Sequence, residues 1–492
     1  MKKYLASFLT ALALFSLPAT AAGSPEHHQN QHRAAQAAVN APAGTIIGRS
    51  FGSVETFAGI PYAQPPVGPL RLKPPQRLNA SVGNFDARGI ASSCPQFVLS
   101  FESRNILLNV VGSFLTLPVF QPITGQEDCL TVTVQPPSGT LADAKLPVLF
   151  WIFGGGFEFG STVSYNGASF VRDGSQTGQP FIFVGVNYRL GGFGFLPGDE
   201  ILQDGSANLG LLNQRMDLKW IADNIASGAN PRAVYDTVVQ AAGCAGSPDT
   251  LDCLRSVSYG TFLRAATSLP SILSYEALAL AYVPRPDGVV FRDSPDILAR
   301  NGRYAAVPMI IGNQEDEGTL FVLFKPGILT TSQLVGYLSE LYFHNASRVQ
   351  LTTLVDTYDR RSSAGSPFRT GIFNEISPGF KWRAAILGDL VFTLARRSFL
   401  AVAKAKYPAV PAWSYLNSYN YGTPIIGTFH TSDILQYLNF LYNLDPNVGI
   451  GGYAQWPEWS QSQQLLWFLN DRTEYLTDDF RNDSYEFIYS NI

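Results

Sequence analysis

One histidine, His430, is the candidate general base of this chain. It follows a strand-like apolar run, whereas the other four histidines lie in an N-terminal stretch without apolar periodicity or beside a glycosylation sequon: His27, His28, His32 and His344. Imidazole titrates near neutral pH, so it can accept a proton and return it during a reaction. A lone histidine is also common in a purely structural role, which is the alternative here.

An acidic loop supplies the candidate partner of this histidine. Residues 307–312 form an apolar run that predicts a buried strand, and the loop Asn313-Gln314-Glu315-Asp316-Glu317-Gly318-Thr319 follows it directly. Active sites of open parallel sheets lie outside the carboxyl ends of the strands. We therefore expect this loop to contribute a carboxylate to a functional site.

A glycine run follows the most apolar strand candidate, Leu146 to Phe153. That strand is predicted to be buried on both faces, as in parallel sheets covered by helices. Gly154, Gly155 and Gly156 have no Cβ, so their backbone N–H groups can approach a ligand closely. Such a run after an early strand can form part of an oxyanion hole; the alternative is a turn without chemistry.

The order of the predicted elements indicates an α/β fold with a mostly parallel central sheet covered by helices. A helix over residues 208–226 should be followed by a strand, because the crossover must return to the sheet. The sequence instead continues with a short helix ending near Gly243, and the next convincing strand is residues 307–311. The earlier strands are expected over residues 45–47, 54–57, 131–134, 146–153 and 181–190.

The totals favour a secreted globular protein. The 492 residues are 46% apolar and 15% charged, with a formal net charge of −4; without a basic stripe, this argues against nucleic acid as a partner. A basic start and a short apolar stretch predict a signal peptide over residues 1–22, and no transmembrane segment is expected. A flexible lead-in over residues 23–44 and one domain over residues 45–492 follow. Neither a cofactor nor a metal is expected.

Four cysteines in a secreted chain predict two disulfides, with three pairings possible from the sequence alone. Cys94 and Cys129 enclose 34 residues, and this segment is so apolar that protein or a partner must cover it. It is either a mobile lid over a lipid-facing site or an ordinary helical excursion packed on the core. Asn79, Asn345 and Asn482 begin N-x-S sequons, which predict exposed positions but also arise by chance.

A series of motifs, in order along the chain, resembles type-B carboxylesterases, most closely the fungal extracellular lipases of that family. The resemblance extends from about Thr45 to the C-terminus. Its motifs are Gly59-Ile60-Pro61-Tyr62, Glu127-Asp128-Cys129-Leu130, the glycine run, Asn187-Tyr188-Arg189-Leu190-Gly191, Asp204-Gly205-Ser206-Ala207-Asn208, Asp316-Glu317-Gly318-Thr319 and Phe429-His430.

The resemblance implies an α/β-hydrolase fold and a secreted carboxylic ester hydrolase, with an ester or lipid substrate that can lie at a lipid–water interface. It implies that Glu317 is the acid of a catalytic triad, that His430 is its base, and that Gly155 and Gly156 donate to the oxyanion hole. It also implies two disulfides, Cys94–Cys129 around the lid and Cys244–Cys253.

The sequence departs from the family after Ala226. In the family, the helix ending there is followed by a strand, a Gly-x-Ser-x-Gly elbow, a helix and a second strand. Here Ser227-Gly228-Ala229 resembles the segment beyond that second strand, and no Gly-x-Ser-x-Gly elbow is recognised anywhere in the chain. A βαβ unit of about 30 residues or more is therefore missing, together with the nucleophile and the oxyanion donor that follows it.

Two nearby sequences imitate an elbow. Arg361-Ser362-Ser363-Ala364-Gly365 does not begin with glycine, has no strand before it and lies after Glu317. Ala242-Gly243-Cys244-Ala245-Gly246 has a thiol in place of the serine, but it follows a predicted helix, and Cys253 is close in sequence. A disulfide is therefore favoured over a nucleophile.

The gap has two physical consequences. Histidine activates a serine by taking its proton, so the acid and base have no hydroxyl to activate. One lost central strand also removes ~5 buried apolar side chains at ~1.5–3 kcal/mol each, comparable with a whole domain's margin of ~5–15 kcal/mol. Three hypotheses follow: a secreted hydrolase whose message is mis-spliced or misread at the junction, a catalytically dead member that binds ester, lipid or protein, and a non-folding isoform.

Overall fold

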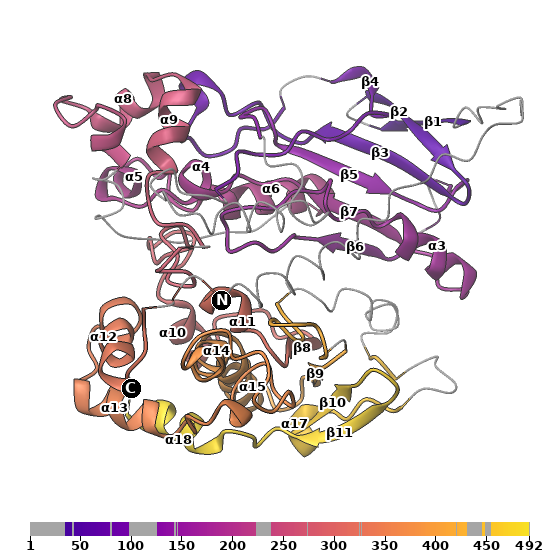
Figure 1. The fold of residues 1–492 in the computed structure, drawn as a ribbon. Coiled ribbons are helices and arrows are strands. Elements are labelled where there is room, and N and C mark those ends of the chain that lie inside the picture. The colour runs from indigo at the N-terminus through magenta and orange to yellow at the C-terminus, as the bar shows by residue number, and fades with distance from the viewer. Residues whose placement is uncertain are drawn as a thin grey trace, which may run out of the picture. The chain divides into compact units, whose positions relative to one another are not determined.

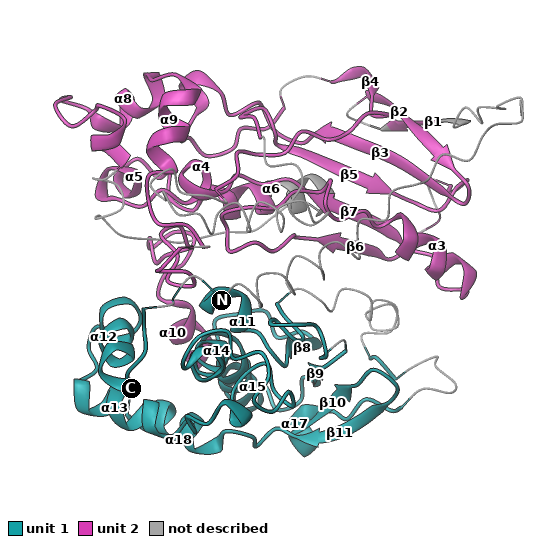
Figure 2. Ribbon diagram, in the orientation of Figure 1, with its two compact units in different colours: residues 1–33, 302–492 teal, residues 34–301 magenta. Residues whose placement is uncertain are grey.

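The computed structural model describes residues 35–41, 44–78, 81–97, 125–141, 144, 146–222, 238–272, 274–323, 325, 327–419, 421–430, 445–447 and 454–491. The predicted signal peptide, most of the proposed lid and the junction at residues 226 and 227 lie outside this range. The chain divides into two compact units, one spanning Ala34–Asn301 and the other containing Gly302–Ile492 (Figure 2).

A mixed seven-stranded sheet forms the framework of the first unit (Figure 1). The strand order is β1-β2-β3-β5-β7-β6, and β4 pairs with β2. Only β6/β7 and β2/β4 run parallel, so the expectation of a mostly parallel sheet is wrong for this unit. The strands are β1 Ala35–Ala41, β2 Gly44–Phe51, β3 Val54–Pro61, β4 Gly83–Asp86, β5 Thr131–Gln135, β6 Val148–Trp151 and β7 Ile182–Val186.

Strand β1 uses residues that the sequence analysis assigned to the flexible lead-in. It pairs antiparallel with β2 along its whole length, from Ala35 opposite Ser50 to Ala41 opposite Gly44. The segment AQAAVNA has small and amide side chains, so it lacks the apolar alternation by which strands are recognised. The lead-in prediction is therefore wrong for these seven residues.

Aromatic side chains build the core on which the helices of the first unit pack. Phe153 stacks on Tyr188 with ring centroids 4.5 Å apart, and Phe193 meets Phe262 edge-on at 4.7 Å. Among the described residues from 238 to 308, no strand occurs, as expected from the sequence. The helices are η1 Gly68–Leu70, α3 Ala168–Gln176, α4 Gly191–Phe195, α5 Asp199–Gln203, α6 Leu209–Ala222, α8 Thr250–Ser256, α9 Tyr259–Ala266 and α10 Pro295–Arg300.

The second unit contains a four-stranded sheet in the order β11-β10-β9-β8. Strands β8, β9 and β10 are parallel, and β11 returns antiparallel to β10. The strands are β8 Met309–Gln314, β9 Ala412–Asn417, β10 Gln464–Phe468 and β11 Thr473–Thr477.

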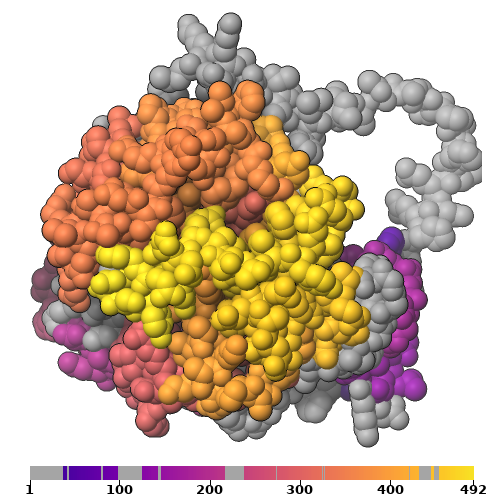
Figure 3. Space-filling view, turned by 90° about the horizontal axis from the view of Figure 1, so that it is seen from below, coloured from indigo at the N-terminus to yellow at the C-terminus, as the bar shows by residue number. Residues whose placement is uncertain are grey.

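Helices cover this second sheet and reach the C-terminus. In the space-filling view the yellow C-terminal segment lies against orange helical segments of the same unit (Figure 3), and Ser484 and Thr357 share a hydrogen bond of 2.8 Å. The helices are α11 Thr319–Val322, α12 Thr331–Leu341, α13 Arg348–Asp356, η3 Ser362–Ala364, α14 Phe380–Gly388, η4 Asp389–Thr393, α15 Leu394–Lys406, α17 Trp459–Ser462 and α18 Asn482–Asn491.

A buried ionic cluster ties α15 to the end of β11. Asp478 has a fully buried side chain and accepts from Arg396 at 2.7 and 2.8 Å, from Arg397 at 3.0 Å and from the indole of Trp459 at 2.9 Å. Burial alone would raise the pKa of Asp478, but the hydrogen bond and charge of Arg396 and the charge of Arg397 outweigh it and lower that pKa. Arg396 also donates to Asn313 at the end of β8, so the cluster supports the strand that carries the acidic loop.

Replacing Asp478 with alanine should therefore destabilise the chain strongly. The substitution leaves two buried guanidinium groups without their carboxylate, which costs about 3–5 kcal/mol. The matched control is Asp471→Ala, because Asp471 pairs with Arg472 at 3.0 Å on the surface and exposed pairs contribute about 0–1 kcal/mol. Urea denaturation of both variants measures the difference; equal losses of stability would contradict the assignment.

Candidate active site

Glu317 and His430 meet in the second unit. Nδ1 of His430 lies 2.6 Å from Oε2 of Glu317, and Oε1 of Glu317 accepts from the backbone N–H of Gln314 at 2.8 Å. The Glu317 side chain is 5% exposed and that of His430 is 36% exposed. An ionised carboxylate accepts at Nδ1, which leaves Nε2 as the basic nitrogen of the ring, as the base of a catalytic triad requires.

Two phenylalanines pack against the imidazole. The ring centroid of His430 lies 4.7 Å from that of Phe392 and 5.7 Å from that of Phe321. The imidazole is therefore held by the carboxylate on one side and by aromatic surface, and it is only partly open to solvent. This environment restricts its orientation.

Asp316 joins the acidic loop, residues 313–319, to the segment before His430 by hydrogen bonds. Its Oδ1 accepts from Ser366 Oγ at 2.8 Å and from the backbone N–H of Phe368 at 2.9 Å, while Oδ2 accepts from the backbone N–H of Thr428 at 2.9 Å. The Asp316 N–H in turn donates to the Thr428 carbonyl at 3.0 Å. Since Asp316 precedes Glu317 and Thr428 lies two residues before His430, these bonds fix the two catalytic candidates relative to each other.

Close approach of the two loops depends on a glycine. Gly427 has φ +56°, and a Cβ on it would lie 2.2 Å from Oδ2 of Asp316. A second hydrogen bond joins the same two loops, since Thr319 Oγ1 donates to the carbonyl of Ile426 at 2.8 Å. The sequence predicts Glu317 and His430 as site residues, and the structure brings these two together. The sequence assigns no role to Asp316 or Gly427, because their roles depend on contacts between distant segments.

The glycine run lies in the first unit, directly after β6. Gly155 has φ +139°, and its carbonyl accepts from the N–H groups of Glu158 and Phe159, so the chain turns tightly there. A Cβ on Gly155 would lie 2.1 Å from the Phe159 carbonyl oxygen, whereas one on Gly156 would touch Ile272 and Leu280 at 3.0 Å. Both glycines have positive φ angles that side chains rarely adopt, +139° at Gly155 and +61° at Gly156, and at Gly155 a Cβ would also meet the backbone.

Glu158 is a buried carboxyl beside these glycines. It is fully buried, and burial raises the pKa of Glu158 well above its usual value. Its Oε2 accepts from the backbone N–H of Ile272 at 3.0 Å, so it holds the chain at Ile272 next to Gly156. This contact shapes the apolar surroundings of the glycine run.

The expectation that the chain has no Gly-x-Ser-x-Gly pattern is wrong. Gly48-Arg49-Ser50-Phe51-Gly52 has this pattern, and it lies between the strands expected over residues 45–47 and 54–57. Ser50 lies in β2 opposite Glu55 of β3, and its Oγ is 3.2 Å from Ser138 Oγ. A hairpin between antiparallel strands is not the strand-to-helix turn of a nucleophile elbow, so Ser50 is not a candidate nucleophile.

The other two imitations of an elbow are also excluded by their structure. Ser362–Ala364 forms the short 3-10 helix η3 with no strand before it. Cys244 is bonded to Cys253, and Cys94 is bonded to Cys129, with Cα separations of 5.8 and 5.0 Å. Both disulfides are therefore those that the family resemblance implies.

Two of the three predicted glycosylation sites lie among the described residues. Asn345 and Asn482 are exposed, which is compatible with a glycan at either position. Asn79 lies outside the described residues. His344 is also exposed.

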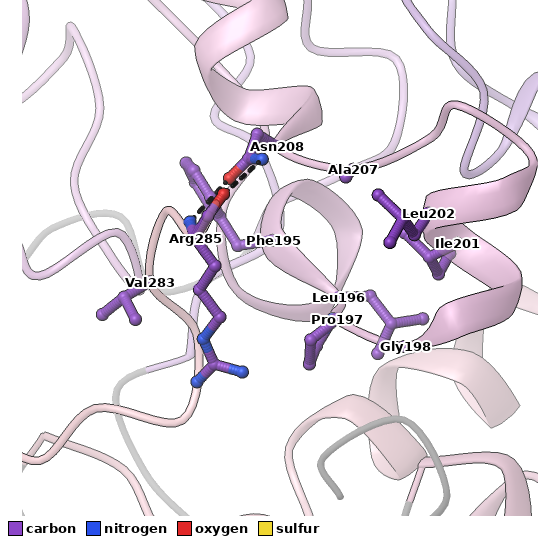
Figure 4. A pocket seen from close by; sticks show the side chains of 10 residues that line it. All are labelled: Phe195, Leu196, Pro197, Gly198, Ile201, Leu202, Ala207, Asn208, Val283 and Arg285. Carbon is purple, nitrogen blue, oxygen red and sulfur yellow. Dashed lines mark hydrogen bonds between the residues drawn. The ribbon is translucent and has the colours of Figure 1, made fainter. Parts of the chain in front are cut away.

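A small pocket in the first unit lies between α5 and the start of α6 (Figure 4). Its polar contributors, Asn208 and Arg285, bond to each other: the Arg285 N–H donates to Asn208 Oδ1 at 3.1 Å, and Asn208 Nδ2 donates to the Arg285 carbonyl at 3.2 Å. These bonds involve the backbone of Arg285, and its guanidinium donates to the Ala281 carbonyl at 2.9 Å. Since the glycine run does not line the pocket, the pocket adds nothing to the candidate site. Among the described residues, no group of three or more His, Cys, Asp or Glu side chains could hold a metal ion.

The arrangement of strands and helices is that of the α/β-hydrolase fold. The model of the carboxylesterase family matches residues 35–237 and 228–437. The chain therefore belongs to the carboxylesterase family. Within the described residues, no helix is long and apolar enough to cross a membrane.

Fungal lipases are among its relatives. The chain is 50% identical to the secreted triacylglycerol lipase LIP1 of Gibberella zeae, over 94% of this chain and 91% of that protein. It is 45% identical to secreted lipase 1 of Botryotinia fuckeliana, over 98% of this chain and 99% of that protein. The crystal structure of Aspergillus niger EstA superposes with a TM-score of 0.76 at 21% identity, covering 92% of this chain and 98% of that one, and supports the fold.

These alignments are longer than the chain itself. The alignment with LIP1 spans 536 positions, whereas 94% of 492 residues is about 462, so about 74 positions are gaps in this chain. The alignment with lipase 1 spans 567 positions against about 482 residues, which leaves about 85 gap positions. The family model also matches in two pieces, and these meet at residues 228–237.

Asp316 should make stability depend on pH. Burial, with the charge of Glu315, raises the pKa of Asp316 from 3.8 to about 7 despite its three donors. The folded protein then holds a proton that the unfolded chain releases, so this contribution is full below about pH 4 and is lost as pH rises to about 7. Asp316→Asn should reduce the change in the free energy of unfolding over this pH range by up to about 4 kcal/mol.

Urea denaturation across this pH range measures the effect. The control is Asp356→Asn, because Asp356 is exposed in the same unit and its substitution should leave the wild-type slope unchanged. Parallel curves for Asp316→Asn and the wild type would show that Asp316 does not titrate as described.

Proposed function

We propose that the enzyme to which this chain corresponds is a secreted lipase or carboxylesterase that uses Glu317 and His430 with a serine absent from the printed sequence. The contact of 2.6 Å between Glu317 and His430 carries this proposal. A buried carboxylate oriented by a backbone N–H, and an accessible imidazole oriented by that carboxylate, form two of the three parts of a triad. Neither part has another evident use.

In the proposed reaction, Nε2 of His430 takes the proton of the serine as the hydroxyl attacks the ester carbonyl. The same nitrogen returns the proton to the leaving alkoxide, and water then hydrolyses the acyl-enzyme with His430 again acting as base. Glu317 holds the imidazole in the required tautomer and stabilises its charged form. The N–H groups of Gly155 and Gly156 would stabilise the oxyanion, since these two glycines follow the early strand β6.

The proposed missing unit explains why the printed chain lacks a nucleophile. The gap positions in the alignments are about 74 and 85, more than a strand–helix–strand unit of about 30 residues needs. The two pieces of the family match also overlap at residues 228–237, close to residues 226 and 227, where the family motifs are interrupted. We place the missing elbow at this junction.

A lipid substrate and secretion complete the proposal. The relatives from Gibberella zeae and Botryotinia fuckeliana are named as secreted lipases, and a lid between Cys94 and Cys129 would suit a long acyl chain at a lipid–water interface. The N-terminal signal layout, the two disulfides and the exposed sequons at Asn345 and Asn482 support an extracellular site of action.

The printed chain should not turn over esters, whereas the chain with the missing segment restored should. Purified printed chain should release p-nitrophenol from p-nitrophenyl butyrate no faster than its own His430→Ala variant. In the restored chain, Glu317→Gln should lower kcat by about 10⁴-fold and His430→Ala by at least as much. A covalent acyl intermediate on the printed chain would disprove the missing nucleophile.

The transcript across codons 226 and 227 distinguishes the hypotheses for the gap. A message that encodes an additional segment with Gly-x-Ser-x-Gly is expected for a mis-spliced or misread hydrolase. A continuous short message, with folded and secreted product that binds a long-chain ester without hydrolysing it, would instead support a catalytically dead binding protein. A short message whose product is retained and aggregates would support a non-folding isoform.

A further inference from the structure

Strand β6 has the side chains of a central strand but lies at the edge of its sheet. Phe150 packs into the cluster around Val184 and Val186, and Trp151 packs on the aromatic core of the first unit. Both faces of the strand are therefore covered. Yet β7 is the only described strand that pairs with β6, and Val148 and Ile152 are 43% and 41% exposed.

The backbone on the open side of β6 offers hydrogen-bonding groups to another strand. The Ile182 N–H donates to the Pro147 carbonyl at 2.9 Å, so alternation directs the N–H and C=O groups of Leu149 and Trp151 toward β7 as well. Those of Val148, Phe150 and Ile152 then point to the open side. Pro147 leaves the open side unblocked, because it faces β7.

The edge at the far side of the second unit's sheet shows how an edge is ordinarily protected. Strand β11 carries Glu474, which pairs with Arg472 at 2.5 Å, and Asp471 lies beside them. Charged side chains on an edge discourage pairing with another chain. In contrast, no residue from Leu146 to Phe157 is charged, so β6 has no such protection.

We propose that the open edge of β6 pairs with β6 of a second copy, so that the printed chain self-associates through this strand. An antiparallel pairing centred on Phe150 places Val148 of each copy opposite Ile152 of the other. The strand is complementary to itself in this arrangement, as a two-fold interface requires, and no like charges face each other.

The side of β8 that faces away from β9 is another open edge, and it competes less well for this role. In β8, alternation from the Met309 N–H, which donates to the Pro411 carbonyl at 3.3 Å, directs Ile310, Gly312 and Gln314 to the side away from β9. The Gln314 N–H is already bonded to Glu317. The end of β8 is thereby closed by the acidic loop, whereas no other strand of the described residues pairs with the open side of β6.

Analytical ultracentrifugation of the printed chain over a wide range of concentrations tests the proposal. The wild type should show a reversible increase in mass to a dimer. Val148→Lys and Ile152→Lys each place a charged side chain opposite an apolar side chain of the other copy. Either substitution should raise the dissociation constant about tenfold or more. Val148→Pro removes an outward N–H without touching the ladder to β7 and should do the same.

Two matched variants control for surface charge. Val289 and Ile90 lie in the same unit, are 70% and 79% exposed and belong to no strand, so Val289→Lys and Ile90→Lys should associate like the wild type. Near-UV circular dichroism checks that every variant keeps its aromatic core. A monomeric wild type, or association reduced equally by both groups of variants, or aggregation unaffected by any of them, would overturn the proposal.

This measurement is independent of ester hydrolysis. The readout is molecular mass, so it can fail while the proposed function stands, and the reverse also holds. The chain with the missing segment restored should remain monomeric in the same experiment, because its own strand would occupy the edge of β6. A restored chain that is active yet dimerises with the same β6 dependence would also overturn the proposal.

Discussion

The candidate active site depends on one buried carboxylate, Asp316, because it joins two loops that are far apart in the chain. Glu317 and His430, the proposed acid and base, are 113 positions apart in the sequence. Each lies in a loop and not in a helix or strand. Three donors from two other segments converge on Asp316. Because the pKa of Asp316 is raised to about 7, the hydrogen bonds that position the two loops and the charge of this group are coupled.

The support behind that carboxylate is also polar and buried. Asp478 accepts hydrogen bonds from Arg396, and Arg396 donates to Asn313. Asn313 lies in β8 and is the first residue of the acidic loop. Buried charges are tolerated only when they are paired and hydrogen-bonded. In the second unit, the acidic loop is therefore held in place by a series of polar contacts that depend on one another. Loss of one partner leaves the next one buried with an unpaired charge.

The sequence was sufficient for local and motif-carried features but not for contacts between distant segments. Strands β5, β7 and β8 follow from apolar runs, and Glu317, His430 and both disulfides follow from motifs that resemble the family. Strand β1 was missed because AQAAVNA has no apolar contrast, although its backbone pairs along its whole length with β2. The antiparallel character of the first sheet was missed because strand direction depends on connections and not on side-chain pattern.

Asp316 illustrates the same limit within the site itself. In the sequence it is one of three acidic residues in the loop 313–319, and nothing distinguishes a carboxylate that clamps a distant loop from one that faces solvent. Gly427 is similar, since the need for a missing Cβ arises from an oxygen contributed more than a hundred positions earlier. Such roles become visible only when the tertiary structure places the partners together.

The two kinds of sheet edge bear on how the gap arose. A protein that had long existed without the elbow unit would be under pressure to protect its exposed strands, because unpaired apolar edges lead to aggregation. The edge at β11 carries charges, whereas β1 and β6 are both edge strands without a charged residue. Absence of charge therefore does not separate an edge that has always faced water from one whose neighbour was lost. For β6, the packing of Phe150 and Trp151 into two different clusters is the feature typical of a central strand, and it agrees with the proposed missing unit.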